Sequence, residues 1–351
     1  MNKVAMGGTA CFVEVILLRS KVSSRQFVRL AASRAMGPWR RVLLTNDDGY
    51  ASPALLKLRE ALEKGEKVET TVVAPNSNQS ACGQRLTLTG RMDLTNHCEI
   101  GQRVYSITGS PSDCAILALD PGGIMHDPPP TLVVSGINLG SNMSHDVLYS
   151  GTFAGARQAA MLGYPAIATS LAGDDFSEKS LAAAVDATMS ITHRLLEILP
   201  IRPENPSRQE LKRQPHNMYA NSSACEDINM AVFHAFRCGD IVLNVNTPCK
   251  WSGNFQCTSL AAIAYRDTVQ RDNHEMWLGE VSVELLKENS KSSDVLVGAA
   301  GDCSISTLQT WPESHPFRVP EFLLEAARMQ GPNGLPAWIS EVAASVSIGA
   351  S

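Results

Sequence analysis

The sequence predicts an α/β fold, in which a mostly parallel β-sheet lies between layers of helices. From residue 41 onward, short runs rich in β-branched and apolar residues alternate with longer helical runs, a pattern typical of βαβ units. The 351 residues are 44% hydrophobic and 19% charged, which is enough to bury a sizeable core in one large or two modest domains. Polar clusters also follow several of the apolar runs, and open parallel sheets build their sites at such strand ends.

The first elements have clear boundary signals. Ser52 precedes Pro53, and Ser110 precedes Pro111; serine caps helices and proline suits their first turn. The apolar runs between these helices have the length and composition of strands. The predicted elements are, in order, a strand at 42–44, a helix at 53–62, strands at 68–74, 86–89 and 103–107, a helix at 111–119 and a strand at 131–134.

The second half is less regular. Residues 138–151 form a long polar loop, and such loops inside compact domains are often functional. Residues 201–237 hold three prolines, four asparagines and mixed charge, which indicates an exposed excursion. The remaining predictions are a helix at 155–162, a strand at 166–171, a helix at 177–199, a strand at 241–245, a strand of a β-arm at 280–286 and weak helix at 316–346.

Residues 1–39 differ in composition from the rest. They are rich in arginine and serine and hold a single acid, Glu14, as organellar transit peptides do. The alternatives are an untargeted extension and an incorrectly predicted start. We expect a cytoplasmic protein, or an organellar one if the extension is a transit peptide. The apolar run 11–18 is too short to cross a bilayer, so no membrane association is expected.

Charge and cysteine usage exclude several classes of site. The net charge of -5 does not favour a stable nucleic-acid complex, which needs clustered basic residues. The nine cysteines include no C-x-x-C pair, and the histidines show no ligand spacing. Reduced thiols are therefore expected, and zinc is not.

An adjacent pair of acids follows the first strand. Asp47 and Asp48 lie between Asn46 and Gly49. Two neighbouring carboxylates repel unless a cation or several donors compensate them, which favours a metal or phosphoryl site. Because this tetrapeptide is also good turn chemistry, a plain surface turn is the alternative.

Other polar groups are expected at the same edge of the sheet. Ser80 lies in the loop after the second strand, Ser110 follows a later strand, and Asn138 follows the strand at 131–134. Two carboxylates, a hydroxyl and an amide oxygen suit Mg²⁺ or Mn²⁺. Helix starts near Ser110 and Thr152 could hold a phosphate.

Five ordered motifs lie within residues 41–172, at 43–50, 72–75, 109–114, 133–140 and 149–152. Taken together, these motifs resemble the SurE family of metal-dependent phosphatases and nucleotidases. The resemblance implies a Rossmann-like three-layer sandwich, one divalent cation (Mg²⁺ or Mn²⁺) per subunit, and hydrolysis of nucleoside 5′- or 3′-monophosphates or of small phosphomonoesters.

The family pattern implies roles for particular residues. Asp47 and Asp48 correspond to catalytic carboxylates that bind the metal, and Asp47 is additionally expected to interact with the attacking water. Ser80 and Asn138 correspond to the remaining metal ligands. The residues expected to bind phosphate or substrate are Asn46, Ser110, Asn142, Ser150, Gly151 and Thr152.

Several nearby acids have structural interpretations instead. Asp113 is expected to cap or pair within its helix. His145 and Asp146 are expected to be a solvated loop pair. Asp174 and Asp175 precede a helix start, where acids favour the helix dipole.

The carboxyl-terminal part departs from the family pattern. The expected organisation is a domain at 40–310 with an insertion at 201–237, followed by a tail at 311–351. In the family, the terminal segment that 301–308 resembles belongs to an arm exchanged between subunits, which implies a homodimer or homotetramer.

Three rival functions remain. A haloacid dehalogenase-type phosphatase would need a D-x-D pair, whereas these acids are adjacent. A receiver-like signalling domain would need a lysine behind a later strand, and 169–170 and 246–248 contain none. The third alternative is a catalytically degenerate, non-enzymatic member of the SurE-like proteins.

Overall fold

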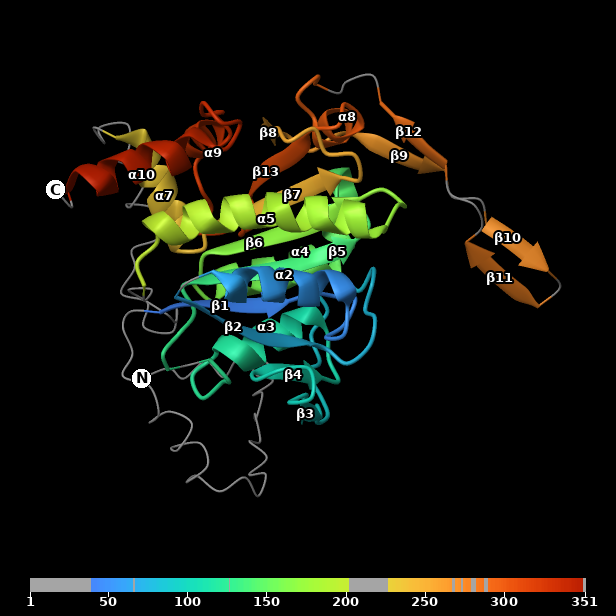
Figure 1. Ribbon diagram of the computed structural model, residues 1–351. Helices are drawn as coiled ribbons and strands as arrows, with labels where there is room; N and C mark the ends of the chain where they lie inside the picture. The colour runs from blue at the N-terminus through green and yellow to red at the C-terminus, as the bar shows by residue number, and fades with distance from the viewer. Residues whose placement is uncertain are drawn as a thin grey trace, which may run out of the picture.

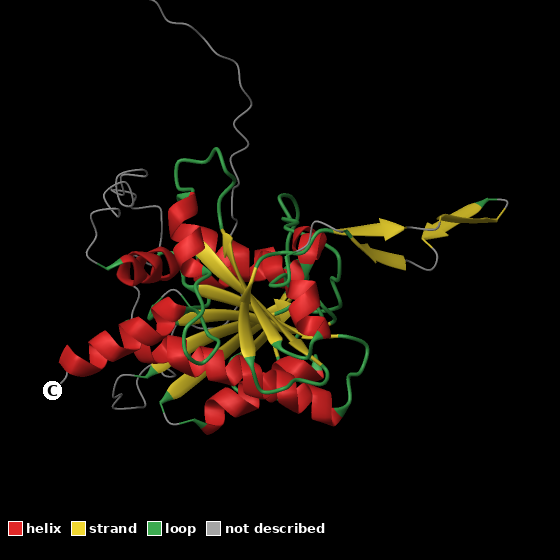
Figure 2. Cartoon of the chain, turned by 90° about the horizontal axis from the view of Figure 1, so that it is seen from above, coloured by secondary structure: helices red, strands yellow, loops and turns green. Residues whose placement is uncertain are grey.

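A computed structural model describes residues 39–65, 67–125, 127–201, 227–266, 269–272, 274–278, 282–286 and 290–349. It confirms the α/β fold, with helices on both faces of a twisted central sheet (Figures 1 and 2). Within these residues the sheet has nine strands in the order β3-β4-β2-β1-β5-β6-β7-β13-β8. The strands are β1 (Arg40–Thr45), β2 (Val68–Pro75), β3 (Leu94–Asn96), β4 (Val104–Ile107), β5 (Leu132–Leu139), β6 (Ala166–Ala172), β7 (Ile241–Pro248), β8 (Phe255–Thr258) and β13 (Cys303–Gln309).

The centre of the sheet is parallel. The pairs β4–β2, β2–β1, β1–β5, β5–β6 and β6–β7 all run in the same direction. At the two sides, β3 runs antiparallel to β4 and β13 antiparallel to β7. After β1 the chain builds outward through β2 to β4, then returns to place β5 on the other side of β1. The carboxyl ends of β1 and β5 therefore form a topological switch point, where such sheets bind ligands.

Alternate side chains of each strand face different helices. Val42 and Leu44 belong to one core cluster, whereas Leu43 between them belongs to the other. This alternation is the strand period of two. The first cluster packs under α2 (Pro53–Lys64), α5 (Glu178–Ile198) and α7 (Ile228–Arg237), and the second under α3 (Pro111–Leu119) and α4 (Gly151–Met161).

The carboxyl-terminal residues join the first of these cores. After α8 (Asp294–Ala299) and β13 come α9 (Glu321–Ala327) and α10 (Ala337–Gly349), which pack against α7. Trp338 is fully buried, and its ring lies 5.2 Å from that of Phe236. Thus α9 and α10 are part of the folded body, and the helix expected weakly at 316–346 is two helices.

A β-arm leaves the body between β8 and α8. It consists of two antiparallel pairs, β9 (Ile263–Arg266) with β12 (Ser282–Leu285) and β10 (Val269–Asp272) with β11 (Glu275–Leu278). Figure 1 shows β10 and β11 projecting away from the sheet. Among the helices of the described residues, none is long and apolar enough to cross a membrane.

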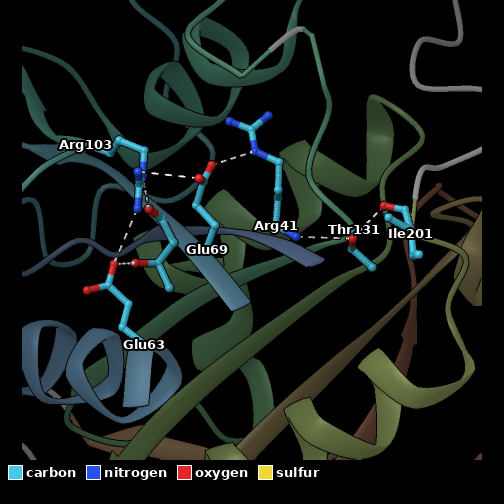
Figure 3. Close-up of polar contacts among 7 residues, drawn as sticks. Arg41, Glu63, Glu69, Arg103, Thr131 and Ile201 are labelled. Carbon is cyan, nitrogen blue, oxygen red and sulfur yellow. Dashed lines mark hydrogen bonds and ion pairs between the residues drawn. The ribbon is translucent and has the colours of Figure 1, made fainter. Parts of the chain in front are cut away.

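An ion-pair network joins neighbouring strands at the amino-terminal end of the sheet (Figure 3). Glu69 of β2 pairs with Arg41 of β1 at 3.0 Å and with Arg103, just before β4, at 3.5 Å. Glu63 of α2 lies 3.9 Å from Arg103. These contacts stabilise the end of the sheet opposite the predicted site.

Three expectations about elements need correction. Residues 86–89 form no strand, because the Thr87 amide and hydroxyl donate to the carboxylate of Asp113 (2.9 and 2.8 Å); the edge strand is β3 instead. The strand after Thr131 continues through Asn138 to Leu139, with a register shift against β6. Helix α4 begins at Gly151 rather than Gly155, because Ser150 caps it.

The expected excursion at 201–237 is also partly wrong. Residues 202–226 lie outside the described part of the chain, but 228–237 form α7. The Asp227 carboxylate accepts hydrogen bonds from two backbone amides at its start, and Val232, Phe233 and Phe236 are buried. Apolar residues recur every three to four positions here, so one face of the helix is apolar and packs into the core.

Candidate active site

The adjacent acids lie where β1 ends, beside the end of β5. A tight turn shapes this corner. The side-chain Nδ2 of Asn46 donates to the Gly49 carbonyl at 3.0 Å, and the Gly49 backbone amide donates to Asn46 Oδ1 at 3.1 Å. Gly49 has a φ of 106°, a conformation that glycine adopts without strain. The Asn46 side chain, expected to bind substrate, is thus buried and bonded within the turn.

Asp47 is held by the start of α4. Thr152 donates its hydroxyl to Asp47 Oδ1 at 2.6 Å and its backbone amide to Asp47 Oδ2 at 3.0 Å. Asp47 is only 3% exposed, so its charge needs such donors. The amino terminus of α4 also carries a partial positive charge. Asp47 therefore occupies an anion-binding position that the sequence suggested for a phosphate.

Asp48 has a poorer set of donors. Its carboxylate accepts a hydrogen bond from the Leu139 amide at 3.1 Å. Burial, together with the charge of Asp47, raises the pKa of Asp48 to about 6, although the hydrogen bond from Leu139 lowers it. Asp48 is thus a carboxylate at the switch point whose charged form a neighbouring cation would stabilise.

Gly151 allows the close approach between α4 and Asp47. A Cβ atom at Gly151 would lie 2.8 Å from Asp47 Cβ and 2.9 Å from both Asp47 Oδ2 and Cys82 Sγ. No side chain fits there. Ser150 accepts the Phe153 amide at 2.9 Å and so caps the helix. The three residues 150–152 therefore shape the wall around Asp47.

Asn138 lies within reach of the same hydroxyl. Its Oδ1 is 3.4 Å from Thr152 Oγ1, and its Nδ2 donates to the Gly140 carbonyl at 2.8 Å. The amide is therefore oriented with its oxygen toward Thr152, whose hydroxyl also donates to Asp47. Asn138 is 8% exposed.

The loop that holds Ser80 is tied to Asp47 through the backbone. The Gln79 amide donates to the Asp47 carbonyl at 2.7 Å. The Ser80 amide donates to Asn78 Oδ1 at 2.8 Å, and the residue is exposed. Ser80 thus follows directly on a residue anchored to the acidic turn.

Ser110 serves as the cap of α3. Its hydroxyl donates to the Arg85 carbonyl at 2.6 Å and accepts the Asp113 amide at 3.2 Å, while its own amide donates to Asp113 Oδ2 at 2.9 Å. The structure confirms the capping interpretation of Asp113. The Ser110 side chain is occupied in this capping box.

Asn142 is buried among polar groups of β6 and β7. Its Nδ2 donates to Ser170 Oγ at 2.9 Å, and its backbone is bonded to the side chains of Asn244 and Asn246. Sequence reasoning missed these three partners. The signal was available: two asparagines spaced i, i+2 in an otherwise apolar strand must share a face and find partners.

The neighbouring acids have the following roles. Asp175 accepts hydrogen bonds from the Ser177 amide at 3.0 Å and the Ser180 hydroxyl at 2.8 Å, so its structural interpretation is confirmed. The expectation of a solvated pair at 145–146 is only partly right: both residues are half-exposed, but Asp146 accepts a hydrogen bond from the Tyr265 hydroxyl at 2.5 Å and the His145 ring packs edge-on against Tyr265.

The donor set suits a hard cation. In the described residues, no group of three or more His, Cys, Asp and Glu side chains could hold a metal ion. The site instead combines two carboxylates with neutral oxygens, and the pKa of Asp48 is raised to about 6 by burial and by Asp47. Asp47, Asp48 and Asn138, with Ser80 on the adjoining loop, are oxygen donors of the type that Mg²⁺ and Mn²⁺ prefer.

Comparison with known proteins identifies similar chains. The family model described as "Survival protein SurE" matches residues 42–268. A Campylobacter lari protein named 5′-nucleotidase SurE is 41% identical over 160 residues, which cover 45% of this chain and 60% of that protein. A protein of the same name from Carboxydothermus hydrogenoformans is 39% identical over 183 residues, covering 49% of this chain and 67% of that protein.

A solved structure extends the similarity. The crystal structure of the SurE protein from Aquifex aeolicus superimposes with a TM-score of 0.56 at 26% identity, and the match covers 78% of this chain and 95% of that chain. By sequence, the chain spans 60% of the length of the C. lari relative. The family match at 42–268 includes the acidic turn and the loop after β5.

Proposed function

The chain belongs to the SurE family, and on that premise we propose that it is a divalent-metal-dependent phosphomonoesterase that hydrolyses nucleoside 5′- or 3′-monophosphates or small phosphomonoesters. One observation carries the proposal: Asp47 and Asp48 stand together at the switch point, one held by Thr152 and the other with its pKa raised to about 6. Two adjacent carboxylates, one buried and the other partly buried, favour a cation.

Asp47, Asp48, Ser80 and Asn138 would hold the metal. When bound, a divalent cation supplies charge neutralisation for the phosphoryl group and acidifies water. Thr152 orients the Asp47 carboxylate, because it donates to both oxygens. Each of these oxygens retains a second lone pair, with which Asp47 would accept a hydrogen bond from the attacking water.

The substrate's phosphate would be bound by the loop at 138–151, beside the amino terminus of α4 that Asp47 occupies. The residues proposed for this are Asn142, Ser150, Gly151 and Thr152, with Asn46 and Ser110 supporting from their turns. Because Asn46 and Ser110 use their side chains within a turn and a capping box, we propose that they act by shaping the backbone around the phosphate.

The decisive experiment is an assay of the full chain on p-nitrophenyl phosphate and on a panel of nucleoside monophosphates. We expect hydrolysis with Mn²⁺ or Mg²⁺, loss with EDTA, and loss in Asp48→Ala. Asp186→Ala is the matched control, since Asp186 is an exposed acid on α5. A folded protein that shows no turnover with any divalent metal would instead be the non-enzymatic member of the family.

Self-association through the arm is a second part of the proposal. The β10–β11 hairpin exposes Val269 (55%), Met276 (67%) and Trp277 (51%), and exposed apolar strands commonly pair with another chain. We propose a homodimer or homotetramer. Light scattering on the full chain tests this, and Trp277→Glu should shift the protein toward the monomer.

A further inference from the structure

We infer that Asn244 and Asn246 are positioning residues that hold Asn142, and with it the loop at 141–149, in the candidate active site. The inference rests on the proposed function, because it assigns these asparagines to the phosphate-binding part of that same site. It concerns strand β7, which contributes no residue to the acidic turn.

The placement of the two asparagines needs an explanation. Both are fully buried in β7, on the face that also carries Val242 of the α3/α4 core. A buried amide costs free energy unless it is hydrogen-bonded, and an apolar residue of similar size would avoid that cost. Asn244 and Asn246 therefore need partners, and those partners lie on one loop residue.

Asn246 binds the backbone of Asn142 at two points. Its Oδ1 accepts the Asn142 amide at 2.8 Å, and its Nδ2 donates to the Asn142 carbonyl at 3.1 Å. Asn244 Nδ2 donates to the same carbonyl at 2.7 Å. The backbone of this loop residue is thus hydrogen-bonded on both its amide and its carbonyl, as in a strand, but its partners are side chains. Both backbone polar groups of Asn142 are satisfied by β7.

The Asn142 side chain is then directed by a third contact. Its Nδ2 donates one hydrogen to Ser170 Oγ at 2.9 Å, and Ser170 is the neighbour of Asn246 in the β6–β7 register. Because an amide nitrogen carries two hydrogens, Asn142 keeps a second donor. Backbone and side chain are fixed together, so this donor has a defined direction.

The position of the loop in the candidate active site depends on the hydrogen bonds between Asn142 and β7. Asn142 lies between Asn138, which approaches Thr152, and Ser150, which caps α4. The residues that follow Asn142 are tied elsewhere: the Ser144 amide donates to Asp294 Oδ2 at 2.8 Å. Asn244 and Asn246 are thus the contacts that set the position of Asn142 itself.

The test compares Asn246→Asp with the wild-type chain, loaded with Mn²⁺. The substitution keeps an oxygen that accepts the Asn142 amide. It replaces the Nδ2 donor with a second oxygen, which cannot donate to the Asn142 carbonyl. We expect the KM for p-nitrophenyl phosphate and the Kd of inorganic phosphate to rise about tenfold, as loss of a hydrogen bond predicts. The Kd of Mn²⁺ should change less than twofold, since the metal-binding residues lie elsewhere. Asn96→Asp, at an exposed asparagine of β3, is the matched control.

A double-mutant cycle separates positioning from general stability. If Asn246 acts through Asn142, then Asn246→Asp should weaken phosphate binding little further when Asn142→Ala is already present. Additive effects would overturn the inference, and so would an Asn246→Asp variant that lowers only the melting temperature. A wild-type chain that binds phosphate without hydrolysing it would refute the proposed function yet still allow the cycle. If it binds no phosphate at all, both proposals are wrong.

Discussion

Asp47 and Asp48 are neighbours in the chain, but their carboxylates meet different surroundings. Asp47 receives two hydrogen bonds from Thr152, whereas Asp48 receives one from the Leu139 amide. Side chains of consecutive residues diverge, so one acid turns toward α4 and the other toward β5. The pair therefore divides into a well-compensated carboxylate and one that gains most from a bound cation.

Protonation of Asp48 should be visible in the stability of the metal-free protein. Because the folded-state pKa of Asp48 is raised from 3.8 to about 6, its contribution to stability is present below pH 4 and is lost as the pH rises through 6. Asp48→Asn replaces the carboxyl with a neutral amide, so stability is no longer lost as the pH rises. In EDTA, we expect urea unfolding at pH 7.5 to show the variant more stable by up to about 3 kcal/mol, with little difference near pH 4.

The control for this prediction is Asp174→Asn, which replaces an exposed acid and should change stability equally little at both pH values. An Asp48→Asn protein less stable than wild type at pH 7.5 would contradict the prediction. Adding Mn²⁺ should reverse the order, because only the wild-type chain would gain stability from the metal.

The Thr152 hydroxyl offers a second test at this scale. Thr152→Val keeps the shape of the side chain but leaves Asp47 Oδ1 without its donor at 2.6 Å. Hydrogen bonds to charged groups contribute about 1.5–3 kcal/mol, so we expect kcat to fall about 10- to 100-fold. Thr152→Ser, which keeps the hydroxyl, should stay within about threefold of wild type. Equal activities of the two variants would show that the hydroxyl has no role.

At the scale of elements, the site depends on where strands and helices end. The loop after β5 is anchored by β7, while α4 begins at Gly151, against Asp47. The opposite end of the sheet is held by charge: Glu69 lies between Arg41 and Arg103 (Figure 3). Stability and chemistry are thus placed at opposite ends of the same strands.

This separation predicts a variant that changes stability alone. Glu69→Gln keeps the shape of the side chain but removes the charge shared by Arg41 and Arg103, which are themselves partly buried. We expect a loss of about 1–2 kcal/mol in urea unfolding at low salt, with unchanged kcat/KM. Glu60→Gln is the control, because its pair with Lys64 is exposed and 3.8 Å apart; it should cost less than about 0.5 kcal/mol. A fall in activity for Glu69→Gln would show that the two ends are coupled.

At the scale of the whole molecule, the carboxyl-terminal helices complete one of the two cores. Residues after 310 are expected from the sequence to form a tail, but α9 and α10 cover α7, and Trp338 is fully buried beside Phe236 and Phe233. The arm, by contrast, exposes apolar side chains away from the body. The terminal helices therefore stabilise the body of the chain, whereas the arm leaves apolar side chains exposed.

Trp338→Ala tests whether these helices fold with the domain. Removing a fully buried aromatic side chain costs about 3–5 kcal/mol, so we expect a single, earlier urea transition by both circular dichroism and fluorescence. Phe322→Ala, at a side chain 38% exposed on α9, should cost less than about 1 kcal/mol. An unchanged midpoint for Trp338→Ala would indicate that α10 contributes little to the fold.

Much of this protein follows from local pattern. The alternating β and α runs predict the sheet and its helices, since strand and helix periods are properties of short segments. The acids after Leu44 and the amide of Asn138 fall at one sheet edge, because parallel strands share a direction. Failures of prediction occurred where a distant side chain intervened: Asp113 takes the backbone amide of Thr87, and residues 228–237 bury a face that their polar surroundings conceal.

By itself the sequence determined the fold class, the acidic turn and the order of the motifs, because neighbouring residues and simple periodicity are sufficient for these. Only the tertiary structure decided that Thr152 holds Asp47, that Asn246 holds Asn142, and that Trp338 closes the core. Each of these contacts joins residues about a hundred positions apart. Their existence depends on strand register and helix placement, which the packing of the whole chain sets and no local pattern encodes.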